Sequence, residues 1–311
     1  MENNQIETVW IGGKNGVEEL LRIANGKGDG FAFGKDDLMK ICLVFADANL
    51  KNNFCNKSAV FRIRSEWKRI SDTVISAASL LAEIGMNSEI LSSYAAVMPI
   101  AYYLFKGGKI EDEKSIREVK KFLGVSFAKN LFCDSDNETL TAVRNTLKNI
   151  DCTLTPFTLA QFRYTALTGG RTFSVTEADI DFWLNNYKKG RNTYILLSLL
   201  YPYLKLRKYS FHQDYCHPYA GFEEKHLSDS GLSPEKIEEW KKKRNLLPNL
   251  QFSEGAENEN KNQTPLKKRV SPSCDFSYRP KGVSLELKDF DTFFEARKAL
   301  MKNKLIEIFE I

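Results

Sequence analysis

The sequence predicts a mainly α-helical protein, in which a helical domain precedes a small α+β domain and a closing C-terminal helix. Through most of the first two-thirds of the chain, apolar residues recur at the three- and four-residue spacing of a helix face. After Pro202 the segment ending at Tyr215 is short, aromatic and alternating, which favours a strand. The end of the chain returns to helical spacing. We therefore expect domains at 1–200, 201–275 and 276–311, with the last helix packing back on the helical domain.

Three helices are predicted most clearly in the helical domain. One ends near Gly85, and its apolar face is formed by Trp67, Ile70, Val74, Ala77, Ala78 and Leu81. A second covers the apolar run Tyr94–Phe105 and ends at Gly107 and Gly108; this run is shorter than the roughly 20 residues that a membrane span requires, so we expect a buried helix. A third begins near Thr176, whose hydroxyl can cap the first turn.

The next segments indicate an all-round buried helix followed by the α+β domain. The run Tyr194–Leu200 is apolar on every side and precedes Pro202, so it should lie in the core. We expect strands at Tyr209–Tyr215 and Leu250–Phe252. A helix between them, Leu232–Arg244, has Ser233 as its cap and Pro234 at its first position. Polar residues at 254–272 predict a loop that contains a short helix.

The chain is predicted to close with an amphipathic helix at Phe290–Ile311. Its expected apolar side consists of Phe290, Phe293, Phe294, Leu300, Met301, Leu305 and Ile308.

Cysteine usage indicates the compartment of the protein, and the placement of charge bears on nucleic-acid binding. None of the six cysteines forms a Cys-x-x-Cys pair and no secretory segment is seen, so we expect a reduced, cytoplasmic protein. A net charge of +5 is too small to indicate nucleic-acid binding by itself. Its placement is more informative, because basic runs surround one segment. They are either solvated helix faces or a surface that faces phosphate: Lys205, Arg207 and Lys208; Lys241, Lys242, Lys243 and Arg244; Lys267, Lys268 and Arg269.

The candidate site lies between these basic runs. All three histidines, His212, His217 and His226, fall within residues 212–226, beside Asp214. Asn249, Asn258 and Lys261 follow. Carboxylate and amide oxygens suit Mg²⁺ or Mn²⁺, and a neutral histidine suits a general base because its pKa lies near working pH. These residue types together are typical of phosphodiester hydrolysis.

This region resembles the HNH (ββα-metal) nucleases. Their first strand ends in Asp-His-x-x-Pro and their second segment reads Asn-x₈-Asn-x₂-Lys; here Asp214 and Pro218, then Asn249, Asn258 and Lys261, stand at these intervals. The resemblance implies that Asp214 and Asn258 bind the metal. It also implies that Asn249 braces the loop and that Lys261 faces a phosphate.

The general-base histidine of that motif falls on Tyr215. A phenol has a pKa near 10 and is a poor base at neutral pH, and losing a base typically lowers the rate by about 10²–10⁴. His212 shares the Asp214 face of the predicted strand and is the substitute base or a structural residue. His217 supports the metal or lies on a surface loop, and His226 is expected on the surface.

Segments along almost the whole chain also resemble the C-terminal half of GmrSD-type restriction endonucleases, which act against modified phage DNA. They are Trp67–Ile70, Ser93–Leu104, Tyr187–Pro202, Leu247–Lys261 and Phe290–Leu305. The N-terminal NTPase domain of that family has no counterpart here, so we expect the nuclease half alone. A separate NTPase-domain subunit is then the expected partner. A split subunit, a split gene and a fragment stay open.

Two functional hypotheses follow. The first is a divalent-metal-dependent DNA endonuclease of an anti-phage restriction system, with Asp214 and Asn258 holding the metal. The second is a weakened or inactive derivative that binds DNA or a partner, because of Tyr215. A zinc site at Cys216, His217 and Cys274 is not expected, since the spacing matches no usual zinc pattern.

Overall fold

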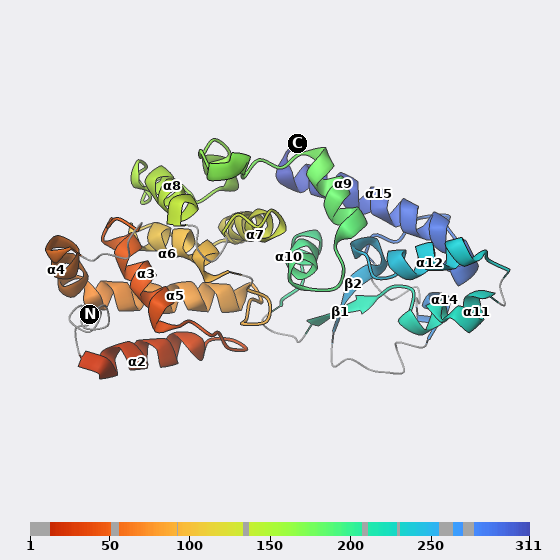
Figure 1. Ribbon diagram of the computed structural model, residues 1–311, viewed down its shortest axis with the longest axis horizontal. Coiled ribbons are helices and arrows are strands. Elements are labelled where there is room, and N and C mark those ends of the chain that lie inside the picture. Colours follow the sequence, from red (N-terminus) through yellow and green to blue (C-terminus); the bar gives the residue numbers. More distant parts are fainter. Residues whose placement is uncertain are drawn as a thin grey trace. The chain divides into compact units, whose positions relative to one another are not determined.

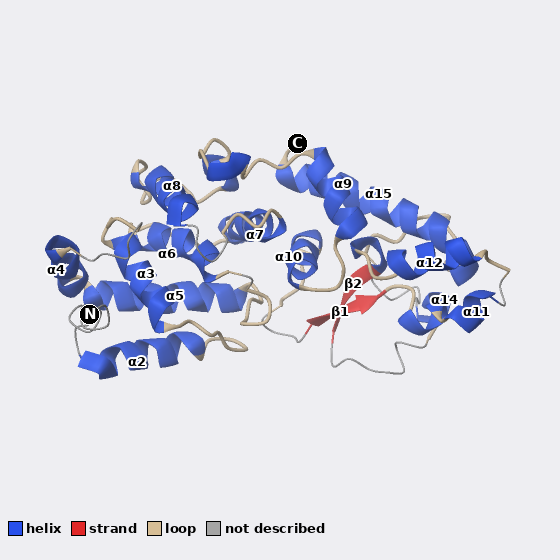
Figure 2. Ribbon diagram, viewed as in Figure 1, coloured by secondary structure: helices blue, strands red, loops and turns tan. Residues whose placement is uncertain are grey.

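The protein is mainly helical and contains a small two-stranded antiparallel sheet (Figures 1 and 2). The structure is a computed structural model that describes residues 13–50, 56–91, 93–132, 137–206, 211–228, 231–254, 264–269 and 277–311. The predicted mainly α fold class is therefore confirmed at this level. No helix in these ranges is both long and apolar enough to cross a membrane.

The chain forms two compact units, unit 1 at Met1–Ser174 and unit 2 at Val175–Ile311. The sequence placed the first boundary at residue 200, because helical spacing continues to that point. The structure groups the two helices before residue 200 with the sheet and the C-terminal helix instead. Packing of side chains, rather than the type of secondary structure, decides where the units divide.

Among the described residues of unit 1, the elements of regular secondary structure are helices joined by turns and loops. Its elements are α2 (Gly13–Asn25), α3 (Lys35–Phe45), α4 (Lys57–Ser65), α5 (Trp67–Glu83), η1 (Tyr94–Val97), α6 (Met98–Phe105), α7 (Glu113–Ala128), α8 (Asn137–Lys148), η2 (Leu159–Phe162) and η3 (Thr168–Gly170).

Two predicted helices of unit 1 are confirmed as α5 and as η1 with α6. Gly85 and Gly107 follow their ends with φ angles of 81° and 90°, a left-handed conformation that glycine adopts without a steric penalty. The predicted burial of Tyr94–Phe105 is confirmed in large part, since most of its residues are buried.

Unit 2 contains the sheet and the candidate site. Its elements are α9 (Glu177–Asn186), α10 (Arg191–Leu200), β1 (Phe211–Tyr215), η4 (Tyr219–Phe222), α11 (Glu224–Ser228), α12 (Pro234–Lys243), η5 (Leu247–Asn249), β2 (Leu250–Glu254), α14 (Leu266–Arg269), η6 (Leu287–Asp289) and α15 (Phe290–Phe309).

The predicted caps in unit 2 are present. The Thr176 hydroxyl accepts a hydrogen bond from the backbone N–H of Asp179, and Ser233 accepts one from Lys236. Each cap satisfies a backbone donor that the first turn of a helix leaves open. These local signals explain why α9 and α12 begin where the sequence indicates.

Helix α15 packs against α9, α10 and η5. A cluster of buried side chains joins its first turns to α12, α14 and the loop after β1: Cys216, Phe222, Leu227, Ile237, Trp240, Leu266, Leu285, Phe290, Phe293 and Phe294. Burial of each large apolar side chain contributes about 1.5–3 kcal/mol, so this cluster holds the site's scaffold together.

The predicted apolar side of α15 needs a correction. Leu300 is 40% exposed, whereas Arg297 and Phe309 are buried. Ile308 is only half-buried. The helix buries residues in steps from Phe293 to Arg297 and Met301, and Leu300 lies off this stripe. Apolarity alone placed Leu300 inside; the direction of its side chain places it in solvent.

Candidate functional site

Asp214 lies next to the end of β1 and is 5% exposed. In the sheet register Asp214 pairs with Gln251, and Tyr215 pairs with Leu250. One carboxylate oxygen, Oδ1, accepts a hydrogen bond from the backbone N–H of Tyr215 at 2.8 Å. The strand therefore presents this carboxylate in a largely dry environment, where a charge requires a partner.

Asn249 is fully buried and joins three segments. Its Oδ1 accepts from the His217 N–H at 2.9 Å, and its Nδ2 donates to the carbonyls of Arg244 at 2.8 Å and His217 at 3.2 Å. Its own carbonyl accepts from the Cys216 N–H at 2.7 Å. These contacts tie the loop after β1 to the end of α12, as expected of a bracing asparagine.

The partner of Asp214 is Arg269, from the short helix α14. Arg269 Nη1 lies 3.3 Å from Asp214 Oδ2, and the two side chains are 15% and 6% exposed. Nη2 donates to the carbonyls of Tyr215, at 2.8 Å, and Cys216. The sequence placed Arg269 in a phosphate-facing run, but the structure turns it inward. Removing one partner of such a buried pair typically destabilises a protein by about 3–5 kcal/mol.

His217 is buried, at 1% exposure, against aromatic rings. Its ring meets those of Phe290 and Phe293 edge-on, with centroids 5.5 and 4.7 Å apart. Burial, together with the charges of Arg269 and Arg297, lowers the pKa of His217 to about 3. Its Nε2 has no hydrogen-bond partner among the described residues. This histidine is neutral at pH 7 and does not face water, which disfavours the predicted catalytic role and excludes the surface alternative.

Tyr215 and His212 are both half-buried on β1. The Tyr215 hydroxyl donates to Asn245 Oδ1 at 3.3 Å, and Asn245 Nδ2 donates to the Lys241 carbonyl at 3.2 Å. Tyr215 is thus tied to the end of α12. His212 pairs with Ser253 across the sheet. Strand alternation places His212 on the Asp214 face, so its role as a base stays a prediction.

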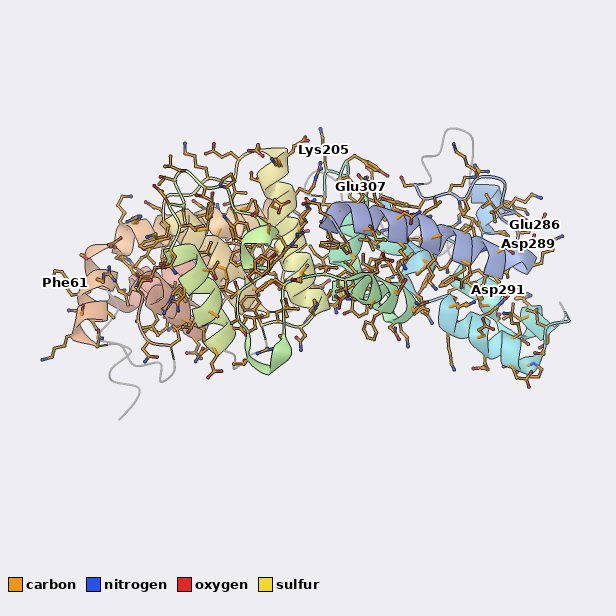
Figure 3. All side chains as sticks on the ribbon, turned by 90° about the horizontal axis from the view of Figure 1, so that it is seen from above. Phe61, Lys205, Glu286, Asp289, Asp291 and Glu307 are labelled. Carbon is orange, nitrogen blue, oxygen red and sulfur yellow. The ribbon has the colours of Figure 1, made fainter. Side chains whose placement is uncertain are left out.

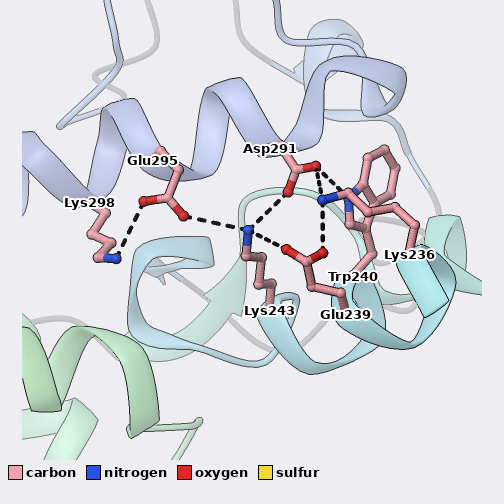
Figure 4. Close-up of polar contacts among 7 residues, drawn as sticks. All are labelled: Lys236, Glu239, Trp240, Lys243, Asp291, Glu295 and Lys298. Atoms are coloured by element: carbon pink, nitrogen blue, oxygen red, sulfur yellow. Dashed lines mark hydrogen bonds and ion pairs between the residues drawn. The ribbon is translucent and has the colours of Figure 1, made fainter.

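Several predicted DNA-contacting cations have carboxylate partners within unit 2. Figure 4 shows Lys243 between Glu239 and Asp291, at 2.8 and 3.0 Å, and Asp291 also accepts from the indole N–H of Trp240 at 3.0 Å. Burial opposes the charge on Lys243, but its hydrogen bonds to Glu239 and Asp291 outweigh burial and raise its pKa. This network fastens α12 to α15. Figure 3 shows Glu286, Asp289 and Asp291 near the start of α15. The positive end of the helix dipole stabilises carboxylates at this position.

Lys241 and Lys267 also form ion pairs. Lys241 Nζ lies 3.1 Å from Glu224 and 2.9 Å from Glu238, and Lys267 Nζ lies 2.6 Å from Glu286. A cation already paired with a carboxylate has less to gain from a phosphate, so these lysines are weaker candidates for DNA contact than their sequence positions indicate.

The other predicted contacts divide into three groups. Lys242 and Lys268 are exposed, and their contact with phosphate stays a prediction. The Arg244 guanidinium lies 3.6 Å from the centroid of the Tyr219 ring and donates to the Phe222 carbonyl at 3.4 Å. Asn258 and Lys261 lie outside the described residues, as do Arg207, Lys208 and Cys274.

The predicted magnesium site lies only partly within the described residues, because Asn258 is outside them. Asp214 is the carboxylate on which such a site depends, and its oxygens are engaged by Arg269 and by the Tyr215 N–H. Within the described ranges, no three His, Cys, Asp or Glu side chains are grouped so that they could hold a metal. Arg269 would have to leave Asp214 before a cation could bind there.

Sequence reasoning missed the inward Arg269, the buried Arg297 and the stacking of Arg244 on Tyr219. Arg297 donates to the Leu250 carbonyl and the Tyr201 hydroxyl, both at 3.0 Å, and so supports the start of β2. One signal was available: Arg297 stands four residues after Phe293, on the apolar stripe of its helix.

Comparisons with models of protein families and with curated protein sequences find no match for this chain. A functional assignment therefore depends on the site.

Proposed function

We propose that unit 2 is an HNH-like, DNA-binding module whose phosphodiester-cleaving activity is strongly weakened in this chain. The observation that carries this proposal is the buried ion pair between Arg269 and Asp214. A guanidinium holds the carboxylate that a nuclease of this type would use for its metal, and Tyr215 stands where the base histidine is expected.

The HNH-like part of the proposal is supported by the frame around Asp214. Two antiparallel strands bring the end of β1 beside the start of β2, and Asn249, which directly precedes β2, bonds to the loop after β1. These features accord with a ββα-metal arrangement. The spacing of Asn249, Asn258 and Lys261 in the sequence points the same way.

The proposed weakening of cleavage is supported by the surroundings of three residues. Asp214 is paired with Arg269, the Tyr215 hydroxyl is bonded to Asn245, and His217 is buried among phenylalanine rings with a lowered pKa. Among the candidate bases, His212 is the one histidine that is half-buried rather than fully buried. Loss of the base by itself is expected to reduce the rate by roughly 10²–10⁴.

A second candidate is an active divalent-metal endonuclease, the module of a restriction system that works with an NTPase-domain subunit on phage DNA. His212 favours this candidate, because it is a half-buried histidine on the Asp214 face of β1 and can replace the missing base. In that case Arg269 would leave Asp214 when DNA and Mg²⁺ or Mn²⁺ bind.

Nicking of supercoiled plasmid in Mg²⁺ or Mn²⁺ separates the two candidates. We expect the wild-type protein to nick no faster than Asp214→Ala, and Tyr215→His combined with Arg269→Gln to gain metal-dependent nicking. Arg279→Gln is the matched control, since Arg279 is an exposed arginine of the same unit. Wild-type nicking that Asp214→Ala abolishes would establish the active endonuclease instead. If the double variant is folded by circular dichroism but neither gains activity nor binds plasmid, the HNH-like assignment is wrong.

A further inference from the structure

Next to the candidate site, unit 2 carries two tyrosine rings flanked by two cations. Tyr219, the first residue of η4, is 46% exposed, and Arg244 covers one part of its ring at 3.6 Å. The Tyr215 ring lies 6.0 Å from that of Tyr219 at an angle of 53°, and Lys189 Nζ lies 6.0 Å from the Tyr215 ring. We call these four residues the tyrosine platform.

The platform is held in place before any ligand binds. Gln213 exchanges two hydrogen bonds of 3.1 Å with the backbone of Gly190, which fixes the loop carrying Lys189 against β1. Arg244 is anchored through the Phe222 carbonyl, and Tyr215 through Asn245. Rings and cations that are already ordered lose little conformational entropy on binding, so they can bind a flat ligand efficiently.

The chemistry of the platform fits one class of ligand. The exposed part of the Tyr219 ring attracts planar aromatic groups, while Lys189 and Arg244 attract negative charge. A nucleic-acid strand whose bases are unstacked offers both groups: its bases can stack on the rings, and its phosphates can pair with the cations. In a duplex the faces of the bases are covered by their neighbours, so duplex DNA offers the phosphates alone.

We propose that the tyrosine platform binds the unpaired bases of a single-stranded nucleic acid, with Tyr219 stacking on a base and Lys189 and Arg244 beside the backbone. This inference rests on the proposed function, because the inference specifies which form of nucleic acid the module binds. It does not require cleavage.

Fluorescence anisotropy in EDTA tests the platform. The probes are labelled oligonucleotides of about 12 nucleotides: a DNA single strand, the RNA of the same sequence, an abasic DNA strand and the DNA duplex. We expect the wild-type protein to prefer the single strands with bases, and Tyr219→Ala to weaken that binding roughly 5- to 150-fold. Tyr219→Phe should keep most of the affinity, because the ring remains.

Tyr164→Ala, which removes a 96% exposed tyrosine of unit 1, is the matched control and should leave binding unchanged. Circular dichroism checks that Tyr219→Ala is folded. A wild-type protein that binds no single strand, or that prefers the duplex, would overturn the inference. So would a Tyr219→Ala loss of equal size on the abasic strand. Because EDTA excludes cleavage, failure here leaves the nicking result, and with it the proposed function, to be judged separately.

Discussion

At the scale of single residues, the site depends on buried polar groups that satisfy one another. Asn249 supplies three hydrogen bonds from one side chain, and Arg269 bonds to Asp214 and to two carbonyls. In a dry environment each lost partner leaves an unsatisfied group, which makes such residues sensitive to substitution.

The role of Asn249 can be measured directly. Asn249→Ala leaves the His217 N–H and the Arg244 carbonyl without this partner, so we expect the free energy of unfolding to fall by roughly 3 kcal/mol. Urea unfolding followed by circular dichroism gives this value. Asn303→Ala, at an exposed position of α15, should change it by less than about 0.5 kcal/mol. Equal effects of the two substitutions would show that Asn249 is no brace.

The lowered pKa of His217 predicts that the folded protein loses stability in mild acid. Its pKa is about 3 in the folded protein and 6.5 ordinarily, so between these values the unfolded chain binds the extra proton. The stabilising contribution is complete above pH 6.5 and is lost as pH falls toward 3, at a slope approaching about 1.4 kcal/mol per pH unit. Urea unfolding at pH 7 and pH 5.5 measures the loss. His217→Leu should reduce it and His226→Gln should not; an unchanged pH dependence in His217→Leu would contradict this assignment.

At the scale of elements, local signals set where a helix begins, whereas packing against other elements sets which of its sides is buried. Thr176 and Ser233 place the starts of α9 and α12 because capping involves residues a few positions apart. Which side of α15 is buried depends instead on α9, α10 and η5, which are distant in sequence. The misplacement of Leu300 has this origin.

Substitutions in α15 test its orientation. Met301 is fully buried, so Met301→Glu should lower the free energy of unfolding by about 3 kcal/mol or more. Leu300→Glu, one position earlier, should change it by less than about 0.5 kcal/mol, because Leu300 is 40% exposed. Thermal melting of the two variants decides between the faces. A severe loss in Leu300→Glu would restore the face that the sequence indicated.

At the scale of the whole molecule, the division into two units is the main result. Each unit encloses its own buried residues, and α9 and α10 belong with the sheet rather than with the preceding helices. The candidate site, the tyrosine platform and the network of Figure 4 all lie in unit 2.

This division predicts how fragments behave. A fragment of residues 175–311 should unfold cooperatively on heating, because α15 keeps its contacts with α9 and α10. A fragment of residues 201–311, cut at the boundary that the sequence suggested, should not, because that cut removes both helices. Near-ultraviolet circular dichroism during thermal melting compares them. Similar cooperative transitions in both fragments would place the boundary at residue 200 after all.

The sequence by itself determined the mainly helical class, the two strands and some of the helices, among them α5, α9, α12 and α15. These depend on spacing, caps, glycine and proline, which act over a few residues. It also singled out Asp214 and Asn249, which are both buried. Asn258 and Lys261 stay predictions.

Tertiary structure alone decided what surrounds those residues. Arg269 reaches Asp214 from 55 positions away in the sequence, His217 meets Phe290 and Phe293 from another helix, and Lys243 meets Asp291. No local pattern tells a basic residue that faces solvent from one that pairs with a distant carboxylate. Burial and pairing set the charge and reach of each side chain, whereas the sequence determines only which groups are available.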